Sequence, residues 1–128
     1  MALVPWAALM LTIRDEQMRV FEAARVDRFV DATVARIAHE HPVRYGALGP
    51  EGTRALVRQG IARAKTYAIE ETGAVGAFID LMLTIHPEFE LQPGMEEVRE
   101  VLEDVEVSGE TRLEIVREDL PAAVPGVE

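Results

Sequence analysis

The apolar run from Val75 to Ile85, which reads VGAFIDLMLTI, constrains the fold more than any other stretch of the chain. On a helix, where successive residues lie about 100° apart, its apolar side chains cover nearly the whole circumference. Only Asp80 and Thr84 share the remaining arc. A helix that is apolar on almost every side has to be surrounded by other elements. The sequence therefore predicts an all-α single domain, a bundle of four to five helices around this central helix.

Length and composition support one domain. A chain of 128 residues can bury a substantial core, and the absence of cysteine excludes disulfides and thiolate metal sites. We expect a cytoplasmic location, which suits a chain without cysteine. Residues 1–13 are almost entirely apolar, but they are too short to span a bilayer and lack the basic start of a signal peptide. The sequence therefore predicts no membrane span.

The charge is unevenly placed along the chain. The formal net charge is -10, which argues against non-specific binding of nucleic acid. Residues 1–67 carry 10 Lys/Arg and 7 Asp/Glu, whereas residues 68–128 carry 3 Lys/Arg and 16 Asp/Glu. Two interpretations are open: an acidic helix packs beside a basic helix within the fold, or an acidic surface binds a basic partner.

Helix signals organise the first half of the chain. Thr12 is a plausible N-cap, and a long helix is expected to run from there to about Glu40, before Pro42. Its apolar face changes side near Arg25, so either the helix bends there or its two halves meet different neighbours. Residues 43–49 are expected to form a loop, and Pro50 suits the first turn of the next helix. Gly60 lies within that helix, where it indicates close approach of another helix.

The second half of the chain continues the helical pattern. Phe89 and Leu91 are expected to anchor the loop after the central helix, and Pro93-Gly94 marks a turn. Residues 95–105 predict an amphipathic helix, and residues 105–116 predict either a hairpin or a short helix capped by Ser108, of which we prefer the helix. We expect a helical domain over 1–120, with an apolar N-terminal arm at 1–12 and a loose C-terminal tail at 121–128.

Two surfaces are candidates for binding a partner. The apolar arm either docks on the helices of its own domain or contacts a partner or a second copy of the chain. The acidic side of the helix expected over 95–105 would attract a basic protein. The predicted partner-binding residues are Trp6 and Leu9 on the arm and Glu96, Glu97, Glu100, Glu103 and Asp104 on the acidic helix.

Candidate catalytic groups are few. Asp80 lies among apolar neighbours, so we expect it to be buried with Arg63 or Tyr67 as its partner. Asp27 and Asp31 lie one helical turn apart and could serve in acid/base or metal chemistry. The chain lacks a nucleophile elbow, a phosphate loop and a zinc signature, and Ser108 is its only serine. We therefore assign no catalytic residue, no metal ligand and no cofactor.

Other polar groups have weaker signals. The three histidines, His39, His41 and His86, lack the spacing of a two-histidine metal site on one helix. A stripe of cations could grip phosphates, but few aromatic residues accompany it and the chain is acidic. The stripe comprises Arg54, Arg58 and Lys65.

The order of motifs over residues 11–120 resembles small uncharacterised helical proteins encoded beside bacterial type VI secretion clusters. The residues that carry the resemblance are Gln17 and Phe21 at the start of the long helix, Gly60, Ile61, Arg63, Ala64 and Tyr67 in the next, and Phe89 after the central helix. Ala68 stands where the pattern has glycine, so the break after this helix should be shaped differently. The resemblance implies an adaptor, chaperone or immunity protein that acts on a secreted effector.

The sequence therefore favours a non-enzymatic protein–protein interaction module. One alternative is a small acid/base or metal-dependent hydrolase built on Asp27, Asp31, Asp80 and the histidines. It requires at least three of these groups to converge in a cleft. The other alternative is a structural homodimer held by the long helix and the arm.

Overall fold

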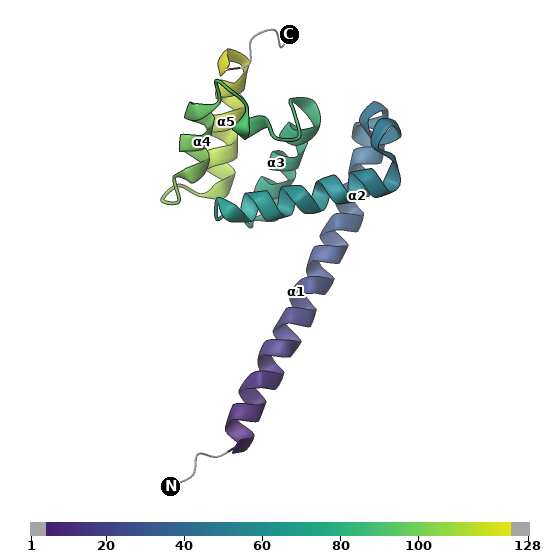
Figure 1. Cartoon of the computed structure of the whole chain (residues 1–128), viewed down its shortest axis with the longest axis vertical. Coiled ribbons are helices and arrows are strands. Elements are labelled where there is room, and N and C mark those ends of the chain that lie inside the picture. The colour runs from purple at the N-terminus through teal and green to yellow at the C-terminus, as the bar shows by residue number, and fades with distance from the viewer. Residues whose placement is uncertain (1–4, 124–128) are drawn as a thin grey trace.

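The computed structural model describes the backbone of residues 5–123 and the side chains of residues 22–120. This part of the chain folds into five helices with no strand, which confirms the predicted all-α bundle (Figure 1). None of its helices is long and apolar enough to cross a membrane. The elements are α1 (Pro5–Glu40), α2 (Pro42–Thr66), α3 (Thr72–Thr84), the 3-10 turn η1 (Phe89–Leu91), α4 (Glu96–Glu103) and α5 (Gly109–Ala123).

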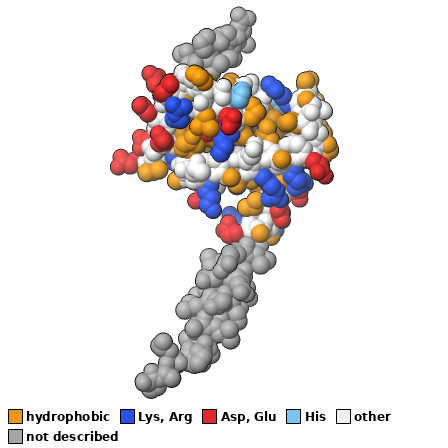
Figure 2. Space-filling view, in the orientation of Figure 1, with side chains coloured by type: hydrophobic (Ala, Val, Ile, Leu, Met, Phe, Trp, Pro, Cys, Tyr) orange, Lys and Arg blue, Asp and Glu red, His pale blue; other side chains and the backbone are white. Residues whose placement is uncertain are grey.

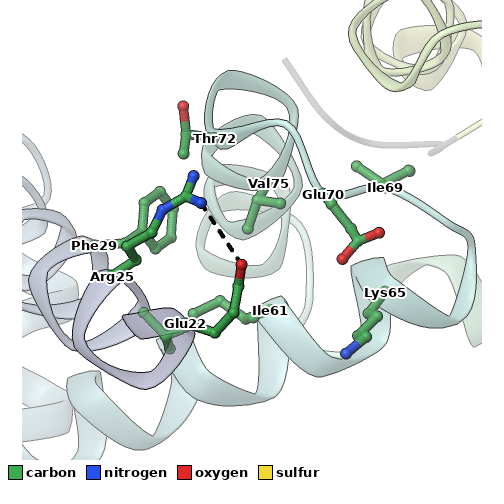
Figure 3. Close-up of a pocket in the computed structure, with 10 residues that line it drawn as sticks. Glu22, Arg25, Phe29, Ile61, Lys65, Ile69, Glu70, Thr72 and Val75 are labelled. Carbon is green, nitrogen blue, oxygen red and sulfur yellow. Dashed lines mark ion pairs between the residues drawn. The ribbon is translucent and has the colours of Figure 1, made fainter. Parts of the chain in front are cut away.

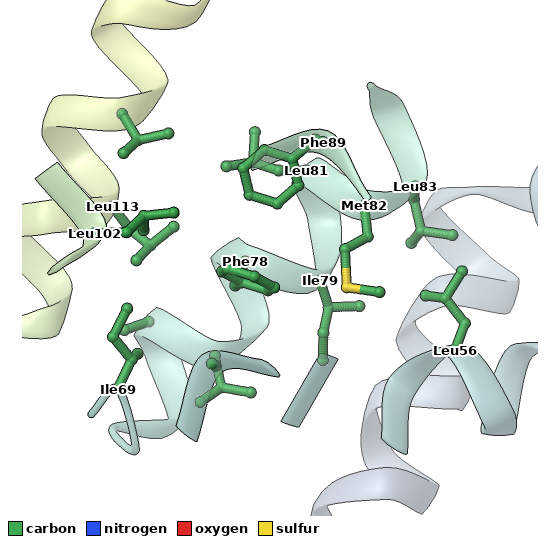
Figure 4. Close-up of a cluster of buried hydrophobic side chains, with 14 of the residues drawn as sticks. Leu56, Ile69, Phe78, Ile79, Leu81, Met82, Leu83, Phe89, Leu102 and Leu113 are labelled. Atoms are coloured by element: carbon green, nitrogen blue, oxygen red, sulfur yellow. The ribbon is translucent and has the colours of Figure 1, made fainter. Parts of the chain in front are cut away.

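Helix α3 is the central helix, as its sequence predicts. It contacts α2 on one side and α5 on the other. Figure 4 shows Phe78 lying towards Leu102 and Leu113, while Met82 lies towards Leu56 of α2. The buried residues of α3 occupy every side of the helix except the arc around Asp80 and Thr84. They are Ala74, Val75, Phe78, Ile79, Leu81, Met82 and Leu83.

Helix α3 packs closely against α2 at Gly60, which confirms the predicted close approach. A Cβ atom at this position would lie 2.5 Å from Ile79 Cγ1 and 3.0 Å from Met82 Sδ. Atoms that close would overlap, so only glycine fits without a shift of Ile79 or Met82. The loss of helix propensity at Gly60 is thus offset by the packing that it permits.

Helix α1 is longer than predicted, because it begins at Pro5 rather than at Thr12. Pro5 suits the first turn of a helix, where its missing N–H has no partner to lose. In the second half of α1, Val30 and Ile37 are fully buried and Phe29 is partly buried, as the apolar pattern predicts. The first half extends away from helices α2 to α5 (Figure 1). The side chains of Trp6 and Leu9 lie outside the described residues, so their contacts remain a prediction.

The loop predicted over residues 43–49 is wrong, since residues 43–48 are helical. Helix α2 begins at Pro42 and kinks at Gly49, whose φ of 74° and ψ of 170° interrupt the helix before Pro50. A positive φ costs glycine little, which explains why the kink falls there. Tyr45 packs against the core and gives the short segment before the kink a tertiary anchor that periodicity does not reveal.

The C-terminal helices follow the prediction closely. Ser108 caps α5, because its Oγ accepts the Thr111 N–H at 3.2 Å, and this confirms a helix rather than a hairpin. In and beside α4, Met95, Val98 and Leu102 are buried, whereas Val105 is 66% exposed and does not belong to the apolar face. Before α4, Phe89 is buried as predicted but Leu91 is 52% exposed. Helix α5 runs on to Ala123, past the predicted start of the tail at residue 121.

Candidate functional site

The acidic side of α4 is the largest set of predicted site residues that the fold brings together. Its five carboxylates are all exposed, and within residues 22–120 none of them forms an ion pair. Figure 2 shows acidic side chains gathered at the edge of the molecule where α4 and α5 lie. These residues are Glu96, Glu97, Glu100, Glu103 and Asp104.

Helix α4 packs on α5 and η1 and not chiefly on the basic helix α2. The interpretation that its charge is balanced by a basic neighbour within the fold is therefore wrong. Its apolar residues Val98 and Leu102 face the core, so the helix has no freedom to turn its acidic side inward. The result is a fixed, solvated row of negative charge, which raises the local concentration of cationic groups.

Asp27 and Asp31 do not form a catalytic pair, because each binds an arginine of α2. The Asp27 carboxylate accepts a hydrogen bond from Arg58 at 2.8 Å, and Asp31 accepts one from Arg54 at 2.6 Å. The two carboxylates are 62% and 64% exposed, so each ion pair contributes at most about 1 kcal/mol. Two of the three cations of the stripe Arg54, Arg58 and Lys65 are thereby engaged, and these contacts join α1 to α2.

The prediction for Asp80 is wrong on both burial and partner. Its side chain is 32% exposed, and Oδ1 lies 3.0 Å from Arg36 Nη1 and 3.6 Å from His41 Nε2. The reason is that Asp80 occupies the one arc of α3 that faces the corner between α1 and α2, where water reaches it. Arg36 also contacts Glu40 at 3.3 Å, so this corner carries a small network of charged groups.

Arg63 and Tyr67 instead share Glu90, a residue that sequence reasoning missed. Glu90 is 1% exposed, and both of its carboxylate oxygens accept hydrogen bonds from Arg63. The Tyr67 hydroxyl donates to Glu90 Oε2 at 3.1 Å, and the Arg63 guanidinium lies 5.5 Å from the centre of the Phe78 ring. The cluster is half-buried on the Arg63 side, and it ties the end of α2 to the loop after α3.

The environment of this cluster changes the acidity of Tyr67. Burial, and then the negative charge and hydrogen bond of Glu90, raise the pKa of Tyr67 from 10.0 to about 12. The phenol therefore stays protonated and keeps donating its hydrogen bond at neutral pH. Because every hydrogen-bonding group of the cluster has a partner within the fold, we interpret it as structural. Nothing in the sequence separated Glu90 from the other glutamates of its loop.

Arg112 is a second buried ion that sequence reasoning missed. It is 3% exposed and donates to the backbone carbonyls of Tyr67 at 2.7 Å and Leu102 at 2.6 Å, and more weakly to Ala68. These carbonyls lie at or just beyond the C-terminal ends of α2 and α4, where helices have carbonyls without intrahelical partners. Arg112 thus ties α5 to backbone carbonyls at the ends of α2 and α4, a role that a charge pattern on α5 does not disclose.

The histidines do not assemble a metal site. His41 lies beside Asp80, His39 is exposed, and His86 Nδ1 accepts the Glu88 N–H at 3.0 Å. Among residues whose side chains are described, no three His, Asp or Glu side chains are grouped so that they could hold a metal ion. The hydrolase alternative requires at least three of these groups to meet in one cleft, and among the described side chains they do not. Asp27 and Asp31 bind arginines of α2, and of the three aspartates only Asp80 lies beside a histidine.

A groove of about 190 Å³ lies between α1, the end of α2 and the start of α3 (Figure 3). Its floor is apolar and includes Phe29, Ile61 and Val75, while Lys65 and Glu70 lie on its rim. Glu22 and Arg25 line it from α1 and pair with each other at 3.6 Å. Neither a histidine nor Ser108 is among its lining residues, and of its two carboxylates Glu22 pairs with Arg25 while Glu70 lies on the rim.

Comparisons of this chain with protein-family models, with curated proteins and with solved structures returned no match. The functional reading of the site therefore depends on its geometry and charge.

Proposed function

We propose that this chain is a non-enzymatic protein–protein interaction module that binds a basic surface of a partner protein through α4. The observation that carries the proposal is the row of exposed carboxylates on α4, which forms no ion pair within residues 22–120. Surfaces of one charge sign steer an oppositely charged partner into contact and accelerate association.

The position of these charges along α4 adds support. Glu100 and Glu103 lie in the last turn of the helix, and no basic residue accompanies them there. Carboxylates at this end oppose the helix dipole, and each costs about 0.3 to 1 kcal/mol. A partner that supplies positive charge would relieve this cost on binding.

The cellular role that we propose is that of an adaptor, chaperone or immunity protein for a secreted bacterial effector. The support is the resemblance carried by Gln17, Phe21, Gly60 and Tyr67. In this role the acidic helix α4 contacts the basic effector. The effector would be a product of a neighbouring gene.

The experiment is capture of partner proteins from the native cell by the immobilised full chain. One variant neutralises α4 by Glu97→Gln, Glu100→Gln and Glu103→Gln. The control variant removes the same number of charges away from α4 by Glu51→Gln in α2, Glu88→Gln in the loop before η1 and Glu118→Gln in α5, all exposed positions. Captured proteins are identified, and the association rate of the principal one is measured at low and high salt.

We expect the unaltered chain and the control variant to capture the same basic protein, and the α4 variant to lose most of it. The association rate should fall steeply with salt, because ions screen charges that lie more than about 10 Å apart at 0.1 M salt. Equal capture by both variants, or an association rate that salt leaves unchanged, would overturn the proposal.

A further inference from the structure

We infer that two copies of this chain pair in parallel along the first half of α1, as a short two-stranded coiled coil. The inference goes beyond the proposed function, because this surface is separate from α4. The starting observation is that the first half of the longest helix extends away from α2 to α5 (Figure 1). A helix with an apolar stripe is stable in water chiefly when another element packs on that stripe.

Residue spacing along this part of α1 is that of a coiled coil. Alternating steps of four and three residues connect six positions, all apolar except one, over about 27 Å of helix. In a coiled coil this spacing marks the positions that face the partner helix. The six positions are Trp6, Met10, Ile13, Gln17, Val20 and Ala24.

Gln17 is the reason to choose a second copy as the partner. A single polar residue inside an apolar seam costs stability unless its amide finds a hydrogen-bonding partner. In a parallel pair of identical helices the same position faces itself, so each Gln17 meets the other and the two amides can bond. Single polar residues in such seams favour parallel, in-register pairing for this reason. An antiparallel pair would place Gln17 against an apolar position.

The described part of α1 sets the end of the seam. The same spacing continues from Ala24 to Asp27 and Asp31, which are exposed and bind Arg58 and Arg54 of their own chain. Two copies of Asp27 facing each other would repel. The paired segment therefore ends at Ala24, where the helix passes from a second copy to its own α2.

The position of the bundle leaves room for this arrangement. Val30, Thr33 and Ile37 are buried against the rest of their own chain. At 100° per residue they lie about 120° to 180° around the helix from Ala24. The two bundles would therefore sit on the outer sides of the paired helices and would not collide.

The chain has no cysteine, which allows a clean cross-linking test on the full-length protein. Gln17→Cys places a thiol in the seam, and Ala8→Cys places one on the opposite side of the same helix. In parallel, sedimentation equilibrium compares the unaltered chain with Ile13→Asp in the seam and Ala8→Asp as the matched control. Circular dichroism verifies that each variant remains helical.

We expect the unaltered chain and Ala8→Asp to sediment at twice the chain mass of 14.2 kDa, and Ile13→Asp at the chain mass. Oxidation should convert Gln17→Cys, but not Ala8→Cys, into a covalent dimer. A monomeric unaltered chain, a dimer that Ile13→Asp leaves intact, or equal cross-linking of both cysteine variants would overturn the inference. These results do not bear on the α4 test, because the two experiments alter different helices.

Discussion

Two positions in and just after α2, Gly60 and Ala68, show how the presence or absence of a Cβ atom affects packing and backbone strain. At Gly60 a Cβ atom would collide with α3, so the position needs glycine. At Ala68 the backbone has a φ of 57°, a left-handed conformation that favours glycine, yet the residue is alanine. Ala68 ends α2 in a Schellman motif, in which Ile69 N–H bonds to Ala64 C=O and Ala68 N–H bonds to Lys65 C=O, both at 2.9 Å.

Gly60→Ala should destabilise the protein although alanine is the better helix former. The new Cβ atom has to displace Ile79 and Met82, and overpacking of this kind costs about 1 to 3 kcal/mol. Gly46→Ala is the control, because a Cβ atom there meets nothing within 4 Å and should raise the free energy of unfolding. Urea unfolding of both variants measures the difference, and a stabilised Gly60→Ala variant would contradict the close approach.

Ala68→Gly should increase the free energy of unfolding by about 1 kcal/mol, because it removes the left-handed strain. Ala62→Gly, at an exposed position inside α2, should instead lower it by a similar amount. The two variants therefore shift the thermal midpoint in opposite directions. If both lower it, Ala68 is not strained.

Tyr67 should make stability fall at alkaline pH. Its pKa is raised from 10.0 to about 12 in the folded protein, so between these values the unfolded chain ionises while the folded chain does not. The contribution of Tyr67 to stability is therefore complete below pH 10 and is lost as the pH rises to about 12. Tyr67→Phe should remove this part of the decline, as followed by unfolding midpoints across that range. In a Tyr45→Phe background, tyrosinate absorbance reports Tyr67 alone.

At the scale of elements, α4 combines a buried apolar side with acidic groups at both ends. Glu96 and Glu97 lie in its first turn, where the helix dipole favours negative charge. Glu103 is its last residue, and at that end the dipole disfavours negative charge. The same side-chain charge thus has opposite effects on stability at the two ends of one short helix.

Glu103→Gln should therefore raise the free energy of unfolding by about 0.5 kcal/mol, and Glu96→Gln should lower it by about as much. Thermal unfolding at low salt measures both, since salt screens the dipole. Under the proposed function Glu103→Gln also weakens partner binding, so one substitution should gain stability while it loses affinity. Equal shifts at the two ends would show that the dipole does not control them.

At the scale of the whole molecule, the net charge of -10 is concentrated after residue 67. Repulsion among these carboxylates destabilises the folded state. The exposed ion pairs of Asp27 and Asp31 are too weak to offset this repulsion. Added sodium chloride should therefore raise the thermal midpoint. The rise should be smaller in the variant that neutralises Glu97, Glu100 and Glu103, and an unchanged midpoint in the unaltered chain would contradict this account.

Much of this fold follows from the local order of residues. The central helix, the need for glycine at Gly60 and the Ser108 cap all depend on spacing within a few turns, because helical periodicity repeats every 3.6 residues. The sequence likewise placed the acidic row on the exposed side of α4. These features depend on neighbours in the chain, which a sequence displays directly.

The tertiary structure decided which polar groups meet. Glu90 binds Arg63 from 27 positions away, and Arg112 reaches the carbonyl of Tyr67 from 45 positions away. No short sequence motif indicates either pairing, because these residues meet only when the apolar sides of the helices pack together. For the same reason Asp80 turned out to face Arg36, and residues 43–48 became helical once Tyr45 packed on the core. Local spacing thus determined the helices and their buried sides, and packing between distant segments determined the contacts of the charged residues.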